Sequence, residues 1–278
     1  MKIWLISFLN KIPYIIWSGA IERKDRSESF LRKIQRKILV KRAAGFIAYG
    51  TKAKQYLLSL GADIKKIQIG INTVDTKFYR SETETLRNNL KLPDDKKHLL
   101  YIGSLSSRKN VIRVLKVINK LSKLRTDFIL DIVGDGEDRK GLGKYVIDNR
   151  LQGGVSFHGF KQKKDIPQFM AQADCFLFQT DYDIWGLVLV EAMAAGVPCI
   201  ASTNAGATYD LIKDGETGFA IDFSETEKVA ERIHWILNNP ELSQKISRNA
   251  SNFIEINANI TRSAEGFTKA ILKVFKYI

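Results

Sequence analysis

Hydrophobic and polar positions alternate in blocks from about residue 98 onward. Short apolar runs of strand length are separated by segments whose apolar residues recur at helical spacing. The predicted strands are 99–103, 128–133, 155–157, 175–178, 197–201 and 218–221. The predicted helices are 111–121, with Asn110 as its N-cap, 166–173, 187–195 and 225–237. Strands that alternate with helices predict a parallel sheet covered on both faces, with ligands at the carboxyl ends of its strands.

The first part of the chain follows the same pattern over a shorter length. Residues 14–17, 45–49 and 67–71 are predicted strands, and Thr51–Leu60 is a predicted helix. We interpret residues 1–78 as a partial N-terminal domain and the polar segment 79–97, which contains Pro93, as a linker. Residues 98–260 form the predicted ligand-binding domain. Residues 261–278 form an amphipathic C-terminal helix, for which packing back on the N-terminal part is one arrangement.

Composition places the chain among ordinary globular proteins, but its charge is uneven. The chain carries a net charge of +14, and residues 1–66 hold 15 basic and 4 acidic residues, an excess of +11. Such an excess favours an anionic surface, either lipid or nucleic acid. Cys175 and Cys199 lie in apolar runs and are predicted to be reduced core residues of a cytosolic protein. The three histidines are scattered along the sequence, and no metal-ligand cluster is evident.

Two glycine-containing loops follow predicted strands. Residues 103–110 run from a strand into a helix, and Arg108 and Lys109 add positive charge where helix N–H groups attract anions, so a diphosphate would fit. A solvated basic turn is an equally good interpretation of that loop alone. Residues 134–139 resemble a dinucleotide fingerprint, but Arg139 occupies the third glycine position and the acidic residues would repel a pyrophosphate. We interpret the second loop as a plain tight turn.

The segment from Asp181 to Pro198 carries the strongest signal. Glu191 interrupts an otherwise apolar helix, and a carboxylate in such a setting needs partners because burying an unpaired charge is costly. Paired sugar hydroxyls are suitable partners, and a lysine or arginine from a neighbouring element is an equally weighted alternative. Gly186 opens the helix and leaves N–H groups for a phosphate, with Asp183 in the loop just before it.

These motifs resemble the C-terminal domain of the family 4 retaining glycosyltransferases, which have the GT-B fold. The stretch around Glu191 matches closely, and Asp183 and Glu191 have the spacing of the family's Glu-x7-Glu pattern. Further signposts are residues 48–51, 72–75, 133–136, 155–160 and 214–218. The resemblance implies an α/β, GT-B-like fold with one complete Rossmann-like C-terminal domain and one incomplete Rossmann-like N-terminal domain.

The resemblance also implies roles for particular residues. Glu191 would hold the donor's ribose hydroxyls, Asp183 the hydroxyls of the transferred sugar, and Lys109 the diphosphate leaving group. These three are the candidate catalytic residues. The candidate donor-binding residues are Gly103, Ser104, Arg108, Lys109, Phe160, Asp183, Trp185, Gly186, Leu187 and Glu191, with Phe160 near the base. The family needs neither a cofactor nor a metal, and its proposed mechanism acts on one face of the sugar.

The chain departs from the family pattern in three ways. Ser104 replaces an arginine and Asn110 replaces a glycine of the phosphate loop, and Arg108 is a candidate for the missing charge. Asp183 is one methylene shorter than the usual glutamate. The chain also begins roughly a hundred residues later than full members, on the scale of most of a domain. We therefore expect a truncated N-terminal domain.

The N-terminal region offers two membrane-related alternatives. Residues 3–9 and 14–17 are apolar, which predicts a short helix and a buried strand, with a membrane-contacting segment as the minor alternative. Residues 29–44 predict a helix with Leu31, Ile34 and Ile38 along one side and basic residues around the rest. Such a helix suits an anionic membrane surface, whereas a helix packed on the sheet with a solvated basic face is the somewhat favoured alternative.

The leading hypothesis is therefore a glycosyltransferase in polysaccharide or glycolipid biosynthesis of the cell envelope. It would move a sugar, with retention, from a UDP- or GDP-linked donor to a glycan or lipid-linked acceptor, in the cytoplasm or on the inner face of the membrane. The alternative is a non-catalytic donor-binding remnant, or one subunit of a split enzyme whose partner chain supplies the missing N-terminal half. A third class is a basic membrane- or nucleic-acid-binding protein, and nucleic acid is disfavoured because no recognised module accompanies the charge.

Overall fold

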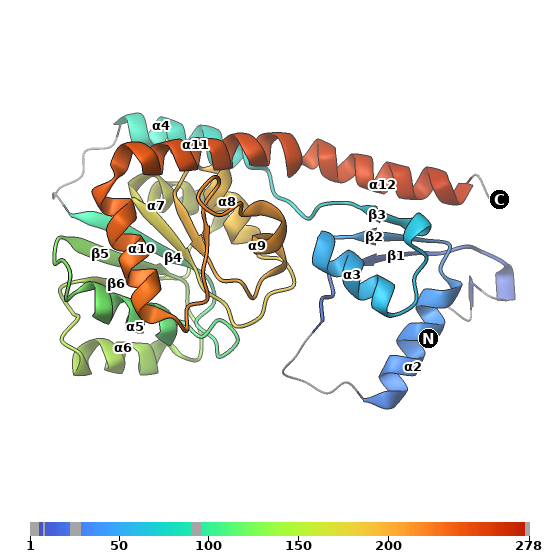
Figure 1. Cartoon of the computed structure of the whole chain (residues 1–278), viewed down its shortest axis with the longest axis horizontal. Helices are drawn as coiled ribbons and strands as arrows, with labels where there is room; N and C mark the ends of the chain where they lie inside the picture. Colours follow the sequence, from blue (N-terminus) through green and yellow to red (C-terminus); the bar gives the residue numbers. More distant parts are fainter. Residues whose placement is uncertain (1–5, 8, 23–28, 90–95, 276–278) are drawn as a thin grey trace. The chain divides into compact units, whose positions relative to one another are not determined.

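A computed structural model describes the chain except for residues 1–5, 8, 23–28, 90–95 and 276–278 (Figure 1). The chain divides into two compact units. One comprises Met1–Thr73 together with Ala258–Ile278, and the other comprises Val74–Asn257. Each unit is built on its own parallel β-sheet.

The larger unit contains a six-stranded sheet in the order β6-β5-β4-β7-β8-β9. The strands are β4 (Lys97–Ile102), β5 (Phe128–Val133), β6 (Val155–Gly159), β7 (Cys175–Phe178), β8 (Cys199–Ala201) and β9 (Phe219–Ala220). All five strand pairings are parallel. Strand β7 is wholly buried, and so are residues 99–101 of β4, as expected for a parallel sheet with helices on both faces.

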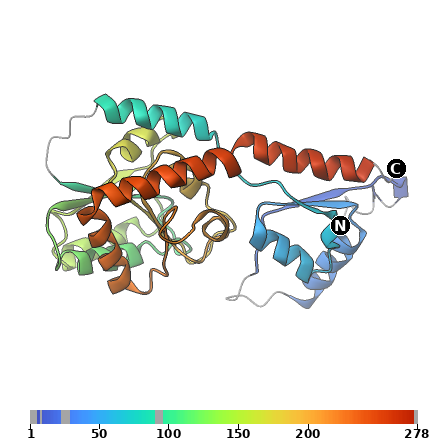
Figure 2. The same cartoon turned by 45° about the horizontal axis from the view of Figure 1, so that its top comes forward.

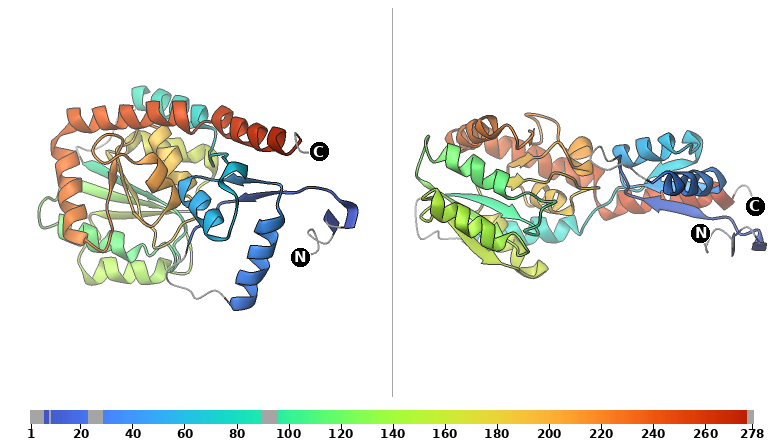
Figure 3. Two further views of the ribbon diagram at one scale, coloured as in Figure 1. Left: turned by 45° about the vertical axis from the view of Figure 1, so that its right-hand side comes forward. Right: turned by 90° about the horizontal axis from the view of Figure 1, so that it is seen from below.

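Two groups of helices cover this sheet (Figure 1, Figure 3). The first group is α5 (Ile112–Leu121), α6 (Arg139–Asp148) and α10 (Thr226–Asn238), and the second is α4 (Thr76–Asn89), α7 (Ile166–Gln172), α8 (Leu187–Ala194) and α11 (Pro240–Asn257). Short elements η2 (Lys163–Asp165) and α9 (Gly206–Leu211) complete the unit. The first group encloses the main apolar core, in which Leu115 and Ile118 of α5 are fully buried against Leu130 and Ile132 of β5. The hydrophobic pattern predicted helix α5 because its apolar residues occupy one face of the helix.

Strand order creates a switch point in this sheet. The chain passes from β4 outward to β5 and β6, and then returns to the other side of β4 to form β7. Strands β4 and β7 are neighbours, but the connection after β4 leads to β5 on one side and the connection after β7 leads to β8 on the other. A crevice outside the carboxyl ends of the strands opens at such a point, and ligands of open α/β sheets bind there.

The smaller unit contains a three-stranded parallel sheet in the order β1-β2-β3. Its elements are β1 (Ile15–Ser18), α2 (Phe30–Arg42), β2 (Gly45–Ala48), α3 (Thr51–Ser59), η1 (Ile64–Lys66), β3 (Ile67–Ile69) and α12 (Ile260–Phe275). Helix α12 packs on β2 and β3, with α3 across the sheet from it (Figure 2). A side chain at Gly266 of α12 would meet the backbone of Ile69 and Gly70, so glycine permits the close approach of α12.

The α/β class and most strands and helices are as the hydrophobic pattern predicts, and three features differ. Residues 79–89, expected to be linker, belong to helix α4, whose Tyr79 and Thr83 are buried. The remaining linker residues 90–95 lie outside the described residues. Helix α5 begins at Ile112 rather than after Asn110. Helices α6, α9 and α11 were not foreseen, because glycines in the first two and polar residues in the third obscure the helical period.

Helix α2 forms where the basic helix was predicted, but its apolar side is exposed. Only Val40 is buried, whereas Leu31, Ile34 and Ile38 are 69%, 39% and 44% exposed. The helix therefore does not pack these residues on the described part of the chain. Of the expected N-terminal helix, residues 3–5 and 8 lie outside the described residues. No helix among the described residues is long and apolar enough to cross a bilayer.

The turn after β5 is held against the loop after β4, and we predict that Gly134 is essential for this contact. Gly134 has φ of +141°, and a Cβ there would clash with the carbonyl oxygen of Gly103. Gly134→Ala is expected to lower the free energy of unfolding by roughly 2 kcal/mol or more, through backbone strain and overpacking. Urea denaturation of the purified chain measures this loss.

The matched control is Gly141→Ala in helix α6, where an added Cβ meets nothing within 4 Å. That change is expected to stabilise the chain by about 0.5–1 kcal/mol, because alanine is the better helix former. Equal effects of the two substitutions would show that the contact between the loops contributes nothing.

Candidate active site

The loops that leave β4 and β7 meet at the switch point of the six-stranded sheet. The carbonyl oxygen of Arg108 accepts hydrogen bonds from the Asp181 N–H at 3.1 Å and from the Thr180 hydroxyl at 3.4 Å. The Asn110 side-chain amide donates to the Asp181 carboxylate at 2.6 Å. Two segments more than 70 residues apart in sequence are thus tied together at the carboxyl ends of adjacent strands.

Lys109 and Asp183 form an ion pair at the centre of this junction. The Nζ atom of Lys109 lies 2.6 Å from Oδ2 of Asp183, and both side chains are largely buried. Lys109 also lies over the ring of Phe178, with Nζ 5.4 Å from the ring centroid. A partly desolvated ammonium group with one carboxylate partner is a strong site for a second anion, since low dielectric strengthens charge attraction.

Arg108 joins the same cluster, a placement that its position beside Lys109 in the sequence did not settle. Its guanidinium donates to the Tyr182 carbonyl oxygen at 2.9 Å and lies 3.4 Å from Oδ2 of Asp183. Two cations therefore share one carboxylate. Ser104, which stands where the family has an arginine, is exposed and lies 3.3 Å from the Ser106 hydroxyl oxygen.

The surroundings of Asp183 keep it ionised. Burial acts to raise its pKa, but the charge and hydrogen bond of Lys109, the N–H of Trp185 and the charge of Arg108 outweigh burial and leave the pKa below its ordinary value. The Trp185 N–H donates to Oδ1 of Asp183 at 3.2 Å. Asp183 is therefore a fixed negative charge that organises the loop entering α8.

Asn110 shapes the phosphate-type loop through its backbone. It adopts φ of +46°, in the left-handed region that glycine occupies freely and that asparagine tolerates better than most residues. The family glycine at this position is thus replaced by the side chain best suited to the same conformation. Its amide then bonds Asp181 instead of capping α5, which is why the predicted N-cap is wrong.

The second glycine loop supports the first one. Gly134 and Gly136 have positive φ, and a Cβ on either would clash with the carbonyl oxygen of Gly103 or Leu105 respectively. The Gly103 N–H also bonds the Val133 carbonyl oxygen at 3.0 Å. The tight turn expected here is present, and its function in the structure is to back the loop that carries Lys109.

Gly186 begins helix α8 in a conformation that other residues rarely adopt. Its φ is +111°, and a side chain there would clash with the ring of Phe178. No side chain caps the helix start, and Leu187 is 39% exposed. Trp185 is buried instead, and its N–H is taken by Asp183, so the start of α8 presents backbone rather than the tryptophan ring.

Glu191 is half-buried on α8 and has two partners in the described chain. The Tyr79 hydroxyl, from helix α4, donates a hydrogen bond to its carboxylate, and the charge of Lys163 in η2 attracts it. Burial raises the pKa of Glu191, and these two interactions only partly offset that effect. A basic neighbour was one of the expected alternatives, but the hydrogen bond comes from a tyrosine in the segment predicted as linker.

Tyr79 is the site residue that sequence reasoning missed. It is 1% exposed, and Lys163 lies over its ring at 5.8 Å and over that of Phe78 at 5.2 Å. Its signal in the sequence was an aromatic pair at the start of a polar segment, which favours an anchored helix over a linker. Burial and the Glu191 carboxylate both raise the pKa of the Tyr79 hydroxyl, so it stays a donor at neutral pH.

Phe160 lies apart from the Lys109–Asp183 pair, at the end of a different strand. It follows β6, the edge strand, and β5 lies between β6 and β4. Its ring is 72% exposed, which leaves an aromatic face open for stacking.

The histidines, scattered in sequence, are partly brought together by the sheet. His98 Nδ1 and His158 Nε2 lie 2.9 and 2.7 Å from the two carboxylate oxygens of Asp131, which is 8% exposed. Within the described residues, no group of three or more histidine, cysteine or acidic side chains has an arrangement suited to a metal ion. The two histidines and Asp131 therefore form a polar cluster across β4, β5 and β6.

Comparison with known proteins assigns the family. The sequence model described as "Glycosyl transferases group 1" matches residues 82–253, and the chain belongs to this family. It is 30% identical over 189 residues to N-acetyl-alpha-D-glucosaminyl L-malate synthase of Bacillus anthracis, covering 67% of this chain and 48% of that protein. It is 28% identical over 178 residues to alpha-D-kanosaminyltransferase of Streptomyces kanamyceticus, covering 63% and 46%. The chain thus spans about half the length of these relatives.

Solved structures show the same fold. Anabaena HepE in complex with UDP matches with a TM-score of 0.82 and 21% identity, covering 96% of this chain and 74% of HepE. Sucrose-phosphate synthase from Thermosynechococcus elongatus matches with a TM-score of 0.80 and 19% identity, covering 99% and 72%. These glycosyltransferases have the GT-B fold, and the expected α/β, GT-B-like class is confirmed.

We predict that Glu191 destabilises the fold at neutral pH. Its pKa is raised in the folded chain, so the folded state holds this proton more tightly than the unfolded state, and stability is lost as pH rises above the unfolded pKa of about 4.3. Glu191→Gln is therefore expected to be more stable than the wild type at pH 7, with a difference that shrinks toward pH 4. Chemical denaturation across this pH range measures the difference.

The control is Glu231→Gln, at an exposed position of α10, which should show no such pH-dependent gain. If Glu191→Gln were less stable than the wild type at pH 7, the carboxylate would be a stabilising group, contrary to the burial argument.

Proposed function

We propose that this chain binds a nucleotide-sugar donor and takes part in retaining glycosyl transfer to a glycan or lipid-linked acceptor. The observation that carries the proposal is the buried Lys109–Asp183 pair at the switch point, with Arg108 beside it. Two cations at the carboxyl ends of β4 and β7 suit a diphosphate, and carboxylates at 183 and 191 suit sugar hydroxyls. Family membership supports this choice, as do the structures of HepE with UDP and with UDP-glucose.

In the proposed reaction, the bond between the sugar's anomeric carbon and the donor phosphate oxygen breaks, and its electron pair leaves with the diphosphate. The acceptor hydroxyl oxygen forms the new bond on the same face, and its proton passes to a donor phosphate oxygen. Lys109 and Arg108 would stabilise the charge that develops on the leaving group. The proposal assigns this charge stabilisation to protein side chains and includes no metal ion.

Asp183 would exchange partners when the donor enters. In the structure it holds Lys109 at 2.6 Å. A diphosphate carries more negative charge than one carboxylate, so Lys109 would turn toward the phosphates and release an Asp183 oxygen for the sugar. Glu191 would keep its bond from Tyr79 on one side and accept ribose hydroxyls with its remaining lone pairs. Phe160 would stack on the base, and the N–H groups of Gly186 and Leu187 would meet the phosphates.

Calorimetric titration with UDP, UDP-glucose and GDP-mannose tests the donor site. Lys109→Met is expected to weaken binding by about tenfold or more, since a hydrogen bond to a charged group contributes roughly 1.5–3 kcal/mol. Glu191→Ala should weaken the nucleotide and the nucleotide sugar alike, because it acts on the ribose. Asp183→Asn should leave UDP binding unchanged or tighter, because Lys109 is freed, while the extra affinity for UDP-glucose is lost.

Lys116→Gln, an exposed change on α5, is the control. Binding that survives both Lys109→Met and Glu191→Ala would remove the site assignment. Sugar transfer by the purified chain distinguishes an enzyme from a non-catalytic donor-binding protein, since donor binding without transfer would favour the second.

We further propose that helix α2 docks on anionic lipid, which would place the protein on the inner face of a membrane. Its exposed apolar residues, Phe30, Leu31, Ile34 and Ile38, form an apolar stripe, and basic residues surround it. The stripe and the charge together match the interfacial mode of membrane binding.

Sedimentation with phosphatidylglycerol-containing vesicles should capture the chain at low salt, and neutral phosphatidylcholine vesicles should not. Lys33→Gln with Lys37→Gln is expected to weaken capture by roughly tenfold or more, at on the order of 1 kcal/mol for each basic residue. The control is Lys116→Gln with Lys140→Gln, which removes the same charge from the other unit. Equal capture by both double variants would contradict a role for α2.

A further inference from the structure

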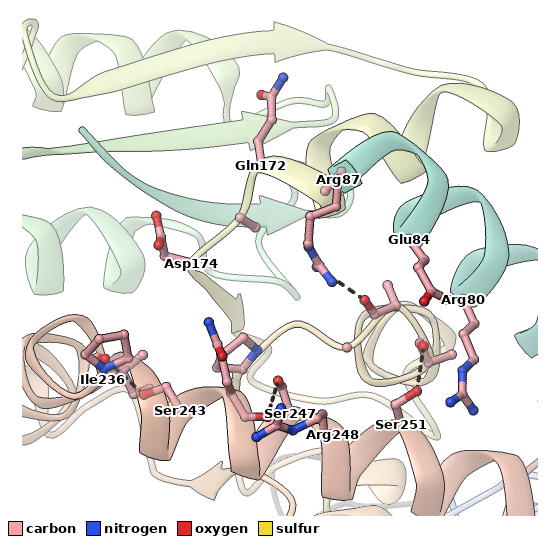
Figure 4. Close-up of a pocket in the computed structure, with 18 of the residues that line it drawn as sticks. Arg80, Glu84, Arg87, Gln172, Asp174, Ile236, Ser243, Ser247, Arg248 and Ser251 are labelled. Atoms are coloured by element: carbon pink, nitrogen blue, oxygen red, sulfur yellow. Dashed lines mark hydrogen bonds between the residues drawn. The ribbon is translucent and has the colours of Figure 1, made fainter. Parts of the chain in front are cut away.

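A second concave site lies at the amino ends of the strands of the six-stranded sheet. A pocket of about 960 Å³ is bounded by helices α4 and α11, by the loop from α8 to β8, and by the residues that precede β4 and β7 (Figure 4). Lys97 begins β4, Asp174 precedes β7 and Pro198 precedes β8, so the pocket faces the amino ends of these strands. The loops that carry Lys109 and Asp183 leave the carboxyl ends. The volume suits a small molecule of nucleotide or sugar size.

The pocket carries an excess of positive charge. Five cationic side chains line it, Arg80, Arg87, Lys96, Lys97 and Arg248, against the two acidic side chains of Glu84 and Asp174, which leaves an excess of three. Lys97 is matched by Asp174 at 3.6 Å. Within the described part of the chain, Arg80, Lys96 and Arg248 form no ion pair. A concave surface lined by one sign of charge concentrates counter-ions.

Arg87 is held in place without being neutralised. Its guanidinium donates to the carbonyl oxygens of Met170 and Ala195 at 3.5 and 3.4 Å. Burial lowers the pKa of Arg87, and only the charge of Glu84, one turn away on α4, opposes that effect. Two long bonds to neutral oxygens fix the planar fork at the pocket wall, which reduces the entropy that a ligand must overcome to engage it.

The floor of the pocket is polar on its α11 side. Ser243, Ser247 and Ser251 recur at intervals of four residues and donate to the carbonyl oxygens of Ile236, Gln244 and Ala194 respectively. Donation to the backbone orients each hydroxyl and leaves its oxygen as an acceptor. Such a surface complements the hydroxyl groups of a sugar or ribose placed between the arginines.

From these features we infer that the pocket binds a phosphorylated small molecule, as a second anion site on this chain. Arginine forks recognise phosphate with paired hydrogen bonds, and here Arg80 and Arg87 from α4 and Arg248 from α11 line the same pocket. The serine face accommodates the organic part. The inference does not rest on the proposed donor site, because no residue of the pocket belongs to it.

Calorimetric titration of the full chain with inorganic pyrophosphate and with glucose 6-phosphate tests the site. Arg80→Gln with Arg248→Gln is expected to weaken binding of at least one probe by tenfold or more. These two side chains are exposed and unpaired among the described residues, so the double variant should fold normally. Arg87→Lys keeps the charge but removes the fork, and it should weaken the same probe by a smaller factor. Preference for glucose 6-phosphate would identify a sugar phosphate, and equal affinity would identify the phosphate group alone.

Two controls separate this site from the donor loops. Lys116→Gln with Lys140→Gln removes two exposed charges elsewhere in the same unit and should leave binding unchanged. Lys109→Met should also leave this binding component intact. The inference would be overturned if probe binding were lost in Lys109→Met but unchanged in the Arg80→Gln, Arg248→Gln double variant. It would also be overturned if neither probe bound the wild-type chain. Loss of nucleotide-sugar binding alone would count against the donor site and not against this one.

Discussion

The position of β4 between β5 and β7 is the constraint on which the rest of the molecule depends. Because the chain builds one half of the sheet outward from β4 and then returns to begin the other half, the loops after β4 and β7 diverge from neighbouring strands. Lys109 and Asp183, 74 residues apart, can form a buried ion pair only through that return. The parallel strands and their apolar core therefore serve to hold two short polar loops in register.

Positively charged side chains gather at both ends of the parallel strands of this sheet. At the carboxyl ends, Lys109 and Arg108 share a single carboxylate, so part of their positive charge remains available for an anion. At the amino ends, arginines from α4 and α11 surround a pocket whose acidic residues are fewer. Helix α4 contributes residues at both ends of the strands, since Tyr79 bonds Glu191 and Arg87 lines the pocket. One helix thus contributes residues to both candidate sites of the larger unit.

The differences between expectation and structure have a common physical origin. A hydrophobic period identifies a helix when one whole face is apolar, as in α5. It fails for a mostly polar helix that is anchored by a few buried side chains, as α4 is by Tyr79 and Thr83. Asn110 fits the sequence rule for a helix cap, but its side chain is turned to a loop 71 residues away, where its amide donates to Asp181. Local rules are reliable until a partner that is distant in sequence orients the same side chain differently.

By itself, the sequence determined the α/β class, the order of most strands and helices, and the family, because buried parallel strands and a long match around Glu191 are local patterns. It also identified Lys109, Asp183 and Glu191 as candidates. The tertiary structure alone decided that Arg108 joins Asp183, that Tyr79 bonds Glu191, and that Phe160 stands apart on the edge strand side. Partners of a charged group are chosen by distance in space, and strand order, which sets those distances, leaves no trace in local sequence.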